Sequence, residues 1–366
     1  MTAAYGMDAG SPQVNVRRKT VEQKILITVL MSVYNTPSEY LCSAVDSILH
    51  QTYQNIEFII IDDGSSGATK NTLRSFHDER IVSICNEHNL GLTKSLNIGL
   101  AAARGKYIAR MDADDISLPE RLEKQLSFME DHPETAALGS YIESVKGKRI
   151  YHTHWTDDRD ILRARMLFGN GGIPHPTAFF RAGFLKKHHI LYDETLQKTQ
   201  DYGMWVDILK QGGQLNLFPQ ILLQYRTSGE QISCKNRDEQ LFFEGTVIER
   251  QLRDLPVNMS EEGQNAVKHF GRGNYEISPS KMNRYLDQII AANRVSHMYD
   301  PMKLALEIDR IWVFGSVKRM KYLHHWDMLL SLRTLRILMP RAFMHFMHYI
   351  FLENYEAHYF KYKLFK

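Results

Sequence analysis

The stretch ILITVLMSVYNTPSEYLCSAVDSILHQTYQNIEFIIIDDGSS, residues 25–66, contains the pattern that decides the fold. Its first part, Ile25–Ser32, is a continuous aliphatic and β-branched run, which is typical of a strand buried on both faces. Ser38–Gln51 has apolar residues at helical spacing, and Glu57–Ile61 is a second buried run. A strand, a helix and a strand in this order predict a parallel βαβ unit.

The same alternation continues along the chain. Further strands are expected at Ile81–Cys85, Lys106–Ala109 and Ala136–Gly139, and further helices at Ala68–Asp78, Leu92–Ala103 and Pro119–Glu130. This order predicts an α/β fold with a mostly parallel sheet flanked by helices. We expect a loose leader over residues 1–24, an α/β domain over 25–240 and a mainly helical region over 241–366.

Composition limits the class of protein. The 366 residues are 43% hydrophobic and 24% charged, which is ordinary globular usage and excludes wholesale disorder, collagen-like repeats and a polytopic membrane protein. The 45 Lys and Arg nearly balance the 42 Asp and Glu, for a net charge of +3. A dedicated nucleic-acid-binding protein would normally have a strongly basic domain, so we expect no nucleic-acid partner.

Cysteine usage and hydropathy predict where the protein works. The three cysteines, Cys42, Cys85 and Cys234, form neither a disulfide framework nor a zinc motif, which favours a reducing compartment. The first 24 residues lack the apolar core of a secretory signal. No run reaches the roughly 18 apolar residues that a spanning helix needs. We expect a cytoplasmic protein.

Polar residues follow the predicted strands at the point where each strand ends. Tyr34 follows the first strand, Asp62 and Asp63 follow the second, and Asp112–Asp115 follows the strand that begins at Lys106. In open parallel sheets, ligands bind beyond the carboxyl ends of the strands. The three clusters are therefore expected to meet at one edge of the sheet.

Asp112, Asp114 and Asp115 place three carboxylates within four residues. Their mutual repulsion would raise their pKa values unless a cation offset it, and carboxylate oxygens suit Mg²⁺ or Mn²⁺. A metal site that also contacts a diphosphate fits this pattern. An Asx turn that caps the following helix is the alternative from the residues alone.

The other polar positions each have two interpretations. Asp62 and Asp63 either close a turn or accept hydrogen bonds from a nucleotide, on whose base Tyr34 could stack. Asp201 is either the N-cap of a helix or a general base that takes a proton from a hydroxyl. His175 either hydrogen-bonds locally or lines a site, and Arg226 pairs either with a diphosphate or with a structural carboxylate.

Taken together, these segments resemble the family 2 glycosyltransferases of bacteria. The matching segments are VLMSVYN (Val29–Asn35), SILHQTYQNIEFIIIDDGSS (Ser47–Ser66), NLGLTKSLNIGLAAARGKYIARMDADD (Asn89–Asp115), GIPHPTAFFR (Gly172–Arg181), TQDYGMWVDI (Thr199–Ile208) and QYRTSGEQIS (Gln224–Ser233). The resemblance implies a GT-A type, Rossmann-like fold in the domain over residues 25–240. It covers well over half of the chain.

The resemblance also implies a role for each matching residue. Those expected to hold the uridine part of the donor are Ser32, Tyr34, Asp62 and Asp63. Asp112 and Asp114 match the DxD pair that binds the metal and the donor, with Asp115 beside them. The remaining matches are the catalytic base Asp201, the acceptor-side residues His175 and Pro176, and the donor-side residues Arg226 and Gln231.

The activity implied is inverting transfer of a sugar from a UDP-sugar to an acceptor hydroxyl, with Mn²⁺ or Mg²⁺ as cofactor and a β-glycoside as product. The expected acceptor is a saccharide or a lipid-linked saccharide, in the synthesis of a surface polysaccharide or lipooligosaccharide. Two alternatives remain open from the sequence. One is another nucleotide-sugar enzyme, such as a nucleotidyltransferase, and the other is a non-catalytic sugar-nucleotide-binding protein.

The last part of the chain is basic and rich in aromatic residues. Ile311–Lys366 holds nine Lys and Arg against three Asp and Glu, with Phe, Tyr and Met interleaved. Such a segment either lies on the anionic inner face of the plasma membrane or forms helices that pack on the α/β domain with a solvated basic face.

Overall fold

A computed structural model of the chain describes residues 26–146, 149–153, 156–226, 237–272 and 277–323. The strands are β1 (Ile27–Val33), β2 (Ile56–Asp62), β3 (Ile81–Cys85), β4 (Tyr107–Asp112), β5 (Ile116–Ser117), β6 (Thr135–Lys146), β7 (Arg149–Thr153), β8 (Phe179–Arg181) and β9 (Gln214–Arg226). They form one nine-stranded sheet in the order β3-β2-β1-β4-β8-β6-β9-β5, with β7 paired to β6.

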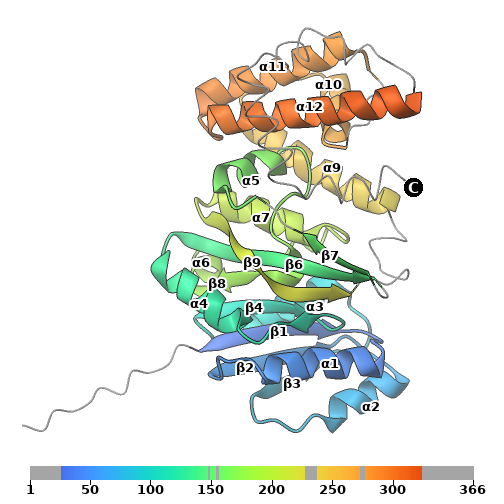
Figure 1. Cartoon of the computed structure of the whole chain (residues 1–366), viewed down its shortest axis with the longest axis vertical. Coiled ribbons are helices and arrows are strands. Elements are labelled where there is room, and N and C mark those ends of the chain that lie inside the picture. The colour runs from blue at the N-terminus through green and yellow to red at the C-terminus, as the bar shows by residue number, and fades with distance from the viewer. Residues whose placement is uncertain (1–25, 147–148, 154–155, 227–236, 273–276, 324–366) are drawn as a thin grey trace, which may run out of the picture.

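Helices cover this sheet and continue beyond it (Figure 1). Those of the first two thirds of the chain are α1 (Ser38–Leu49), α2 (Gly67–Ser75), α3 (Leu92–Ala102), α4 (Arg121–Asp131), α5 (Arg159–Met166), the 3-10 turn η1 (His175–Thr177), α6 (Ala182–Lys187) and α7 (Gln200–Lys210). Those of the last third are α9 (Arg237–Asp254), α10 (Glu261–Phe270), α11 (Pro279–Ser296) and α12 (Pro301–Leu323).

The N-terminal half of the sheet has the predicted parallel βαβ arrangement. β1 pairs in parallel with both β2 and β4, and β2 pairs in parallel with β3. The side chains of β2 are all buried, as are six of the seven in β1, because helices cover both faces. This confirms the prediction from the two continuous apolar runs.

The other half of the sheet contains both parallel and antiparallel pairs of strands. β8 runs antiparallel to both β4 and β6, while β6 and β9 pair in parallel along most of their length. No crossover helix leads from η1 into the three-residue strand β8, so the chain enters the sheet against the direction of β4. The α/β class is confirmed, and the antiparallel pairs all involve the short strands β5, β7 and β8.

The two faces of the sheet have separate apolar cores. One core packs α1 and α4 on the odd-numbered residues of β4, through residues such as Val45, Leu122 and Met111. The other includes Ile108 and Trp205, and it extends without a break to Ile289 of α11 and Trp312 of α12. The C-terminal helices therefore share a core with the α/β domain.

The region after Arg237 is helical as far as it is described, to Leu323. Within the described residues, no helix combines the length and the apolar character required to span a bilayer. Most of the basic segment over 311–366, including all of it beyond 323, lies outside the described residues.

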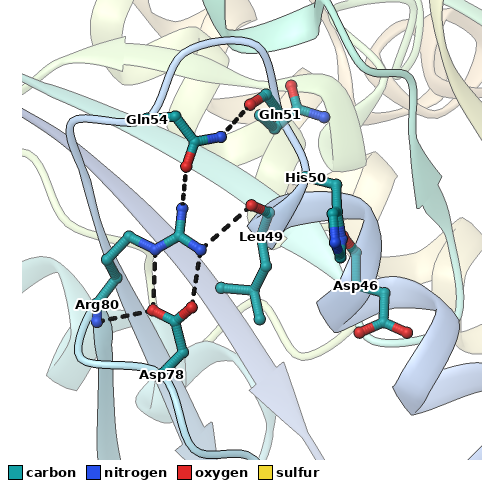
Figure 2. Close-up of polar contacts among 7 residues, drawn as sticks. All are labelled: Asp46, Leu49, His50, Gln51, Gln54, Asp78 and Arg80. Atoms are coloured by element: carbon teal, nitrogen blue, oxygen red, sulfur yellow. Dashed lines mark hydrogen bonds and ion pairs between the residues drawn. The ribbon is translucent and has the colours of Figure 1, made fainter.

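A polar cluster fastens the amino ends of the parallel strands (Figure 2). The Arg80 guanidinium donates to both carboxylate oxygens of Asp78, at 2.9 and 2.8 Å, and to the Leu49 carbonyl at the end of α1, at 3.2 Å. It also donates to Gln54 Oε1 at 2.6 Å. The cluster joins the start of β3, the end of α1 and the loop before β2.

Candidate active site

The sheet register brings the three polar clusters together at one edge. Ser32 of β1 lies opposite Asp112 of β4, and Val33 lies opposite Asp62 of β2. Because these strands are parallel, the loops that follow them leave the sheet at the same side. The predicted convergence of Tyr34, Asp62 and the Asp112–Asp115 loop at this edge follows from that register.

The loops after β1 and β2 are tied to one another. Asn35 adopts a left-handed backbone conformation with φ of 50°. Its backbone N–H donates to Ser65 Oγ at 3.1 Å, and its side-chain oxygen accepts from the Ser66 N–H at 3.0 Å. Tyr34, just before it, is half exposed. An open aromatic ring beside a fixed loop is a suitable surface for stacking a base.

Asp62 and Asp63 are buried, and both take part in loop structure. Asp62 Oδ1 accepts from the Ser65 N–H at 2.8 Å, which closes an Asx turn. The Asp63 carboxylate accepts from Asn86 Nδ2, Leu90 N–H and Gly91 N–H at 2.8–2.9 Å. The turn interpretation is therefore correct, and a nucleotide contact by either carboxylate stays a prediction.

Asp112, Asp114 and Asp115 can each direct one carboxylate oxygen to within 4.8 Å of the others. Burial, followed by the charge of Asp112, raises the pKa of Asp114 to about 6. Burial and the same neighbouring charges raise the pKa of Asp115 well above its ordinary value. Keeping three carboxylates ionised this close together is costly without a cation.

The donor set fits a hard divalent ion. Asp115 is fully buried, and its Oδ1 accepts from the Arg226 N–H at 2.9 Å. Its Oδ2 has no hydrogen-bond partner among the described residues. Carboxylate oxygens are the ligands that Mg²⁺ and Mn²⁺ prefer. A buried carboxylate oxygen without a donor, beside two further carboxylates, is what a site for such an ion supplies.

Two buried arginines, which the sequence analysis did not single out, flank the acidic cluster. Arg110 of β4 is 3% exposed and forms an ion pair with Asp112 through Nη2. Arg121 of α4 is fully buried and donates to the Arg110 carbonyl at 2.7 Å. The signal for Arg110 was a charged residue in the otherwise buried strand YIARMD.

Asp201 lies in the first turn of α7, where Thr199 occupies the N-cap position. The interpretation of Asp201 as the N-cap is therefore wrong. Its Oδ2 accepts from Asn170 Nδ2 at 3.1 Å, and its Oδ1 accepts from the Tyr202 N–H at 2.8 Å. Burial raises the pKa of Asp201, while these hydrogen bonds and the charge of Arg110 oppose the rise.

Arg110 is the residue that links Asp201 electrostatically to the acidic cluster. Its guanidinium is in contact with Asp112, and its charge opposes the rise in the pKa values of Asp114, Asp115 and Asp201. Electrostatic effects of this kind fall off with distance. The charge of Arg110 therefore acts on Asp201 as well as on the acidic cluster.

His175 and Pro176 are buried in η1. The ring nitrogen Nε2 of His175 is 2.8 Å from Tyr192 Oη, and the ring packs edge-on against Trp205. Burial, reinforced by the charge of Arg110, lowers the pKa of His175 well below its usual value, so the ring is neutral at pH 7. The local hydrogen bond matches one of its two interpretations, and a role toward the acceptor stays a prediction.

Arg226 ends β9 beside the acidic cluster. Its backbone N–H binds Asp115, and its guanidinium lies 4.0 Å from the ring centroid of Tyr40. The structural link to a carboxylate thus runs through the backbone. Gln231, expected in the same segment, lies outside the described residues.

Sequence comparisons identify the family. The family model described as Glycosyl transferase family 2 matches residues 28–189. An uncharacterized glycosyltransferase of Haemophilus influenzae is 36% identical over 228 residues, which cover 59% of this chain and 69% of the relative. The amylovoran biosynthesis glycosyltransferase AmsE of Erwinia amylovora is 32% identical over 220 residues, covering 57% and 79%.

Solved structures agree on the fold. TarS of S. aureus, residues 1–349 in complex with UDP, superposes with a TM-score of 0.53 at 17% identity, covering 82% of this chain and 92% of TarS 1–349. The mannosyltransferase PcManGT of Pyrobaculum calidifontis, in complex with GDP-Man and Mn²⁺, gives 0.52 at 16%, covering 87% and 89%.

The mixed sheet with its flanking helices is a fold of the GT-A type. The chain belongs to glycosyltransferase family 2, which confirms the resemblance inferred from its motifs.

Proposed function

We propose that the chain transfers a sugar from a UDP-sugar to a hydroxyl of a saccharide acceptor and inverts the anomeric carbon. The observation that carries this proposal is the acidic cluster of Asp112, Asp114 and Asp115 at the carboxyl end of β4, beside the buried Arg110. The charge of Arg110 also acts on a separate, partly buried carboxylate, Asp201. Family membership favours transfer over the nucleotidyltransferase and non-catalytic alternatives.

In this proposal Asp201 is the general base. Its carboxylate takes the proton of the acceptor hydroxyl as the acceptor oxygen bonds to the anomeric carbon. The bond from that carbon to the phosphate oxygen breaks, and UDP leaves with the electron pair. Asn170 and the Tyr202 N–H hold the carboxylate in place for this step. Direct displacement inverts the centre, so an α-linked donor gives a β-glycoside.

Asp112, Asp114 and Asp115 would hold Mn²⁺ or Mg²⁺ beside the donor diphosphate. Such an ion supplies Lewis-acid stabilisation of the charge on the leaving diphosphate. The buried Asp115 oxygen without a partner and the raised pKa of Asp114 support this assignment. The relative PcManGT, whose structure contains Mn²⁺, also supports it.

The uridine end of the donor is assigned to the loops after β1 and β2. Tyr34 offers an exposed ring for the base, while Ser32, Asp62 and Asp63 line the same end of the sheet. Arg226, at the acidic cluster, is assigned to the diphosphate side. Complexes of structural neighbours with UDP, UDP-GlcNAc and GDP-Man support a nucleotide-sugar donor, and the choice of uridine rests on the match of Tyr34 and Asp63 to the family motifs.

On the acceptor side we place His175 and Pro176 of η1. The neutral, hydrogen-bonded His175 would support the wall of this side without exchanging a proton. The biosynthetic role of AmsE supports an acceptor from a surface polysaccharide or lipooligosaccharide. We also propose that the basic segment over 311–366 contacts anionic lipid at the inner face of the plasma membrane, where lipid-linked acceptors are found.

The test is UDP release from a panel of UDP-sugars, with Mn²⁺ and several saccharide acceptors. We expect acceptor-dependent release of UDP by the wild type and loss of release in Asp114→Ala. Release of pyrophosphate would instead indicate a nucleotidyltransferase. Full turnover by Asp114→Ala would overturn the metal assignment.

A further inference from the structure

Arg110 is a buried cation on the strand that leads to the acidic cluster. Its side chain and that of Asp112 lie on the same face of β4, because residues two apart in a strand point the same way. Nη2 of Arg110 contacts Oδ1 of Asp112. This contact fixes one oxygen of the carboxylate and leaves the other oxygen to a further ligand.

The fold alone does not account for this arginine. Its Nε and Nη1 are buried and have no hydrogen-bond partner within the described part of the chain. Leaving such donors unpaired is costly. Arg121, buried beside it, binds Gln125, Met111 and the Arg110 carbonyl through its three nitrogens. A purely structural arginine is expected to use its donors as Arg121 does.

Arg181, at the other end of β4, has a complete set of structural contacts. Its register partner on β4 is Tyr107, the first residue of that strand. The Arg181 nitrogens donate to Thr135 O, Tyr107 Oη, Met129 O and His132 O at 2.7–3.0 Å. Arg181 therefore supports the fold at a distance from the acidic cluster.

Among the described residues, the Arg110 guanidinium has one polar partner, and that partner is a member of the acidic cluster. A carboxylate that binds a metal needs a fixed orientation, which its hydrogen-bond partners outside the metal shell provide. A buried positive charge beside three clustered carboxylates also offsets their repulsion before an ion arrives. The orientation of the Asp112 carboxylate and the reduced repulsion both depend on the Arg110 guanidinium, and neither effect requires a partner for Nε or Nη1.

We propose that Arg110 is a positioning residue, which holds the Asp112 carboxylate in the orientation that binds the divalent ion. This inference rests on the proposed function of the acidic cluster as a metal site. Removing such a partner typically weakens metal binding by about 10- to 100-fold.

The test compares Mn²⁺ binding to the wild type, Arg110→Met and Arg181→Met, measured on the full chain by the loss of the free Mn²⁺ signal in electron paramagnetic resonance. We expect Arg110→Met to raise the Kd for Mn²⁺ by about 10- to 100-fold. Arg181→Met should lower the melting temperature and leave the Kd unchanged. Circular dichroism of each variant checks that it is folded.

Two further variants keep the test decisive. Arg110→Gln retains an N–H donor for Asp112 without the charge, and Arg110→Lys retains the charge, so both should bind Mn²⁺ more tightly than Arg110→Met. A folded Arg110→Met whose Kd lies within twofold of the wild type would overturn the inference alone. Failure of all three variants to fold would make Arg110 structural and would also overturn it. A wild type that binds no Mn²⁺ would overturn the proposed metal site together with the inference.

Discussion

Asp201 is partly buried and accepts two hydrogen bonds, and this combination suits a base. Burial raises the pKa of Asp201, which makes the carboxylate more willing to accept a proton than an exposed one. Asn170 and the Tyr202 N–H fix its two oxygens, so the group is oriented before the acceptor arrives. Both properties are those expected of the residue that takes the proton from the acceptor hydroxyl.

The rate of transfer should depend on the ionisation of Asp201. Only the carboxylate can take the proton, and its pKa lies above the ordinary 3.8, so activity should fall as pH drops through the raised value. Asp201→Asn should lower kcat/KM by about 10²- to 10⁴-fold and remove this acid limb. The measurement is the pH profile of UDP release at saturating Mn²⁺. Activity of Asp201→Asn within tenfold of the wild type would exclude Asp201 as the base.

We expect the charge of Asp115 to lower the stability of the metal-free protein and to be required for metal binding. Its raised pKa means that ionised Asp115 disfavours the folded state, and that this cost appears as pH rises above 3.8. Asp115→Asn keeps an acceptor for the Arg226 N–H and removes the charge. We expect the metal-free variant to melt about 1–2 °C higher, the shift that ~1 kcal/mol produces when the entropy of unfolding scales with the 366 residues of the chain.

Metal-dependent UDP release by Asp115→Asn should fall by about 100-fold or more, because a ligand has been lost. The control is Asp46→Asn, an exposed aspartate on α1, which should change neither property. Unchanged melting together with full activity in Asp115→Asn would show that Asp115 does not belong to the metal site.

Some site residues could be predicted from the sequence, and others could not. Asp112 could be placed beside Asp62 because parallel strands end at the same edge of a sheet, and Asp112 and Asp114 were singled out because they also match the family's DxD pair. Asn170 and Arg110 were missed because their partners, Asp201 and Asp112, become recognisable only when α7 and β4 are placed in space. The loop role of Asp63 depends on Asn86 and Leu90, whose position the sequence did not reveal.

At the level of elements, the two ends of the parallel strands differ in their polar contacts. The candidate active site follows the carboxyl ends, while hydrogen bonds of the Arg80 cluster stabilise the amino ends (Figure 2). Hydrogen bonds from Arg80 lower the pKa of Asp78 to about 2. This cluster therefore supports stability without touching the site.

Arg80→Met should cost about 1–3 kcal/mol of unfolding free energy at pH 7, since it removes charged hydrogen bonds to Asp78 and Leu49. The lowered pKa of Asp78 gives a stabilisation that is present above pH 3.8 and is lost as pH falls toward 2. The difference from the wild type should therefore shrink over that range. Urea unfolding at several pH values measures it, and a constant difference would contradict the prediction.

The first half of the sheet could be predicted because its strands are short, continuous apolar runs between helical patterns. The second half could not, because β9 is long and only partly buried, and because the pairing of β6 with β9 is not local in sequence. Their pairing joins residues about 80 positions apart, for example Leu138 with Asn216, and no local pattern specifies it. The three-residue strand β8 is too short to give a periodic signal.

For the whole molecule, the C-terminal helices are part of the folded unit. One apolar core joins the sheet to α11 and α12. Glu307 of α12 is fully buried between Arg165 of α5, at 3.4 Å, and Arg310 of its own helix. As far as residue 323, this matches one of the two alternatives drawn from the sequence, in which the region packs on the α/β domain.

Glu307→Ala should destabilise the entire chain, because it leaves two largely buried arginines without their carboxylate. We expect a loss of about 3–5 kcal/mol in a single unfolding transition. Glu262→Ala, which removes the exposed ion pair with Lys281, should cost less than about 1 kcal/mol. Differential scanning calorimetry distinguishes them. Separate melting of the C-terminal helices in Glu307→Ala would argue against a shared core.

The central claim is that one site holds the donor diphosphate at the acidic cluster with Asp201 on the other side of the sugar. The most direct test is a crystal structure with Mn²⁺ and a non-hydrolysable UDP-sugar, in which anomalous scattering locates the ion. The account predicts the ion on oxygens of Asp112, Asp114 or Asp115, with the anomeric carbon facing Asp201. An ion bound elsewhere, or a sugar that points away from Asp201, would contradict it.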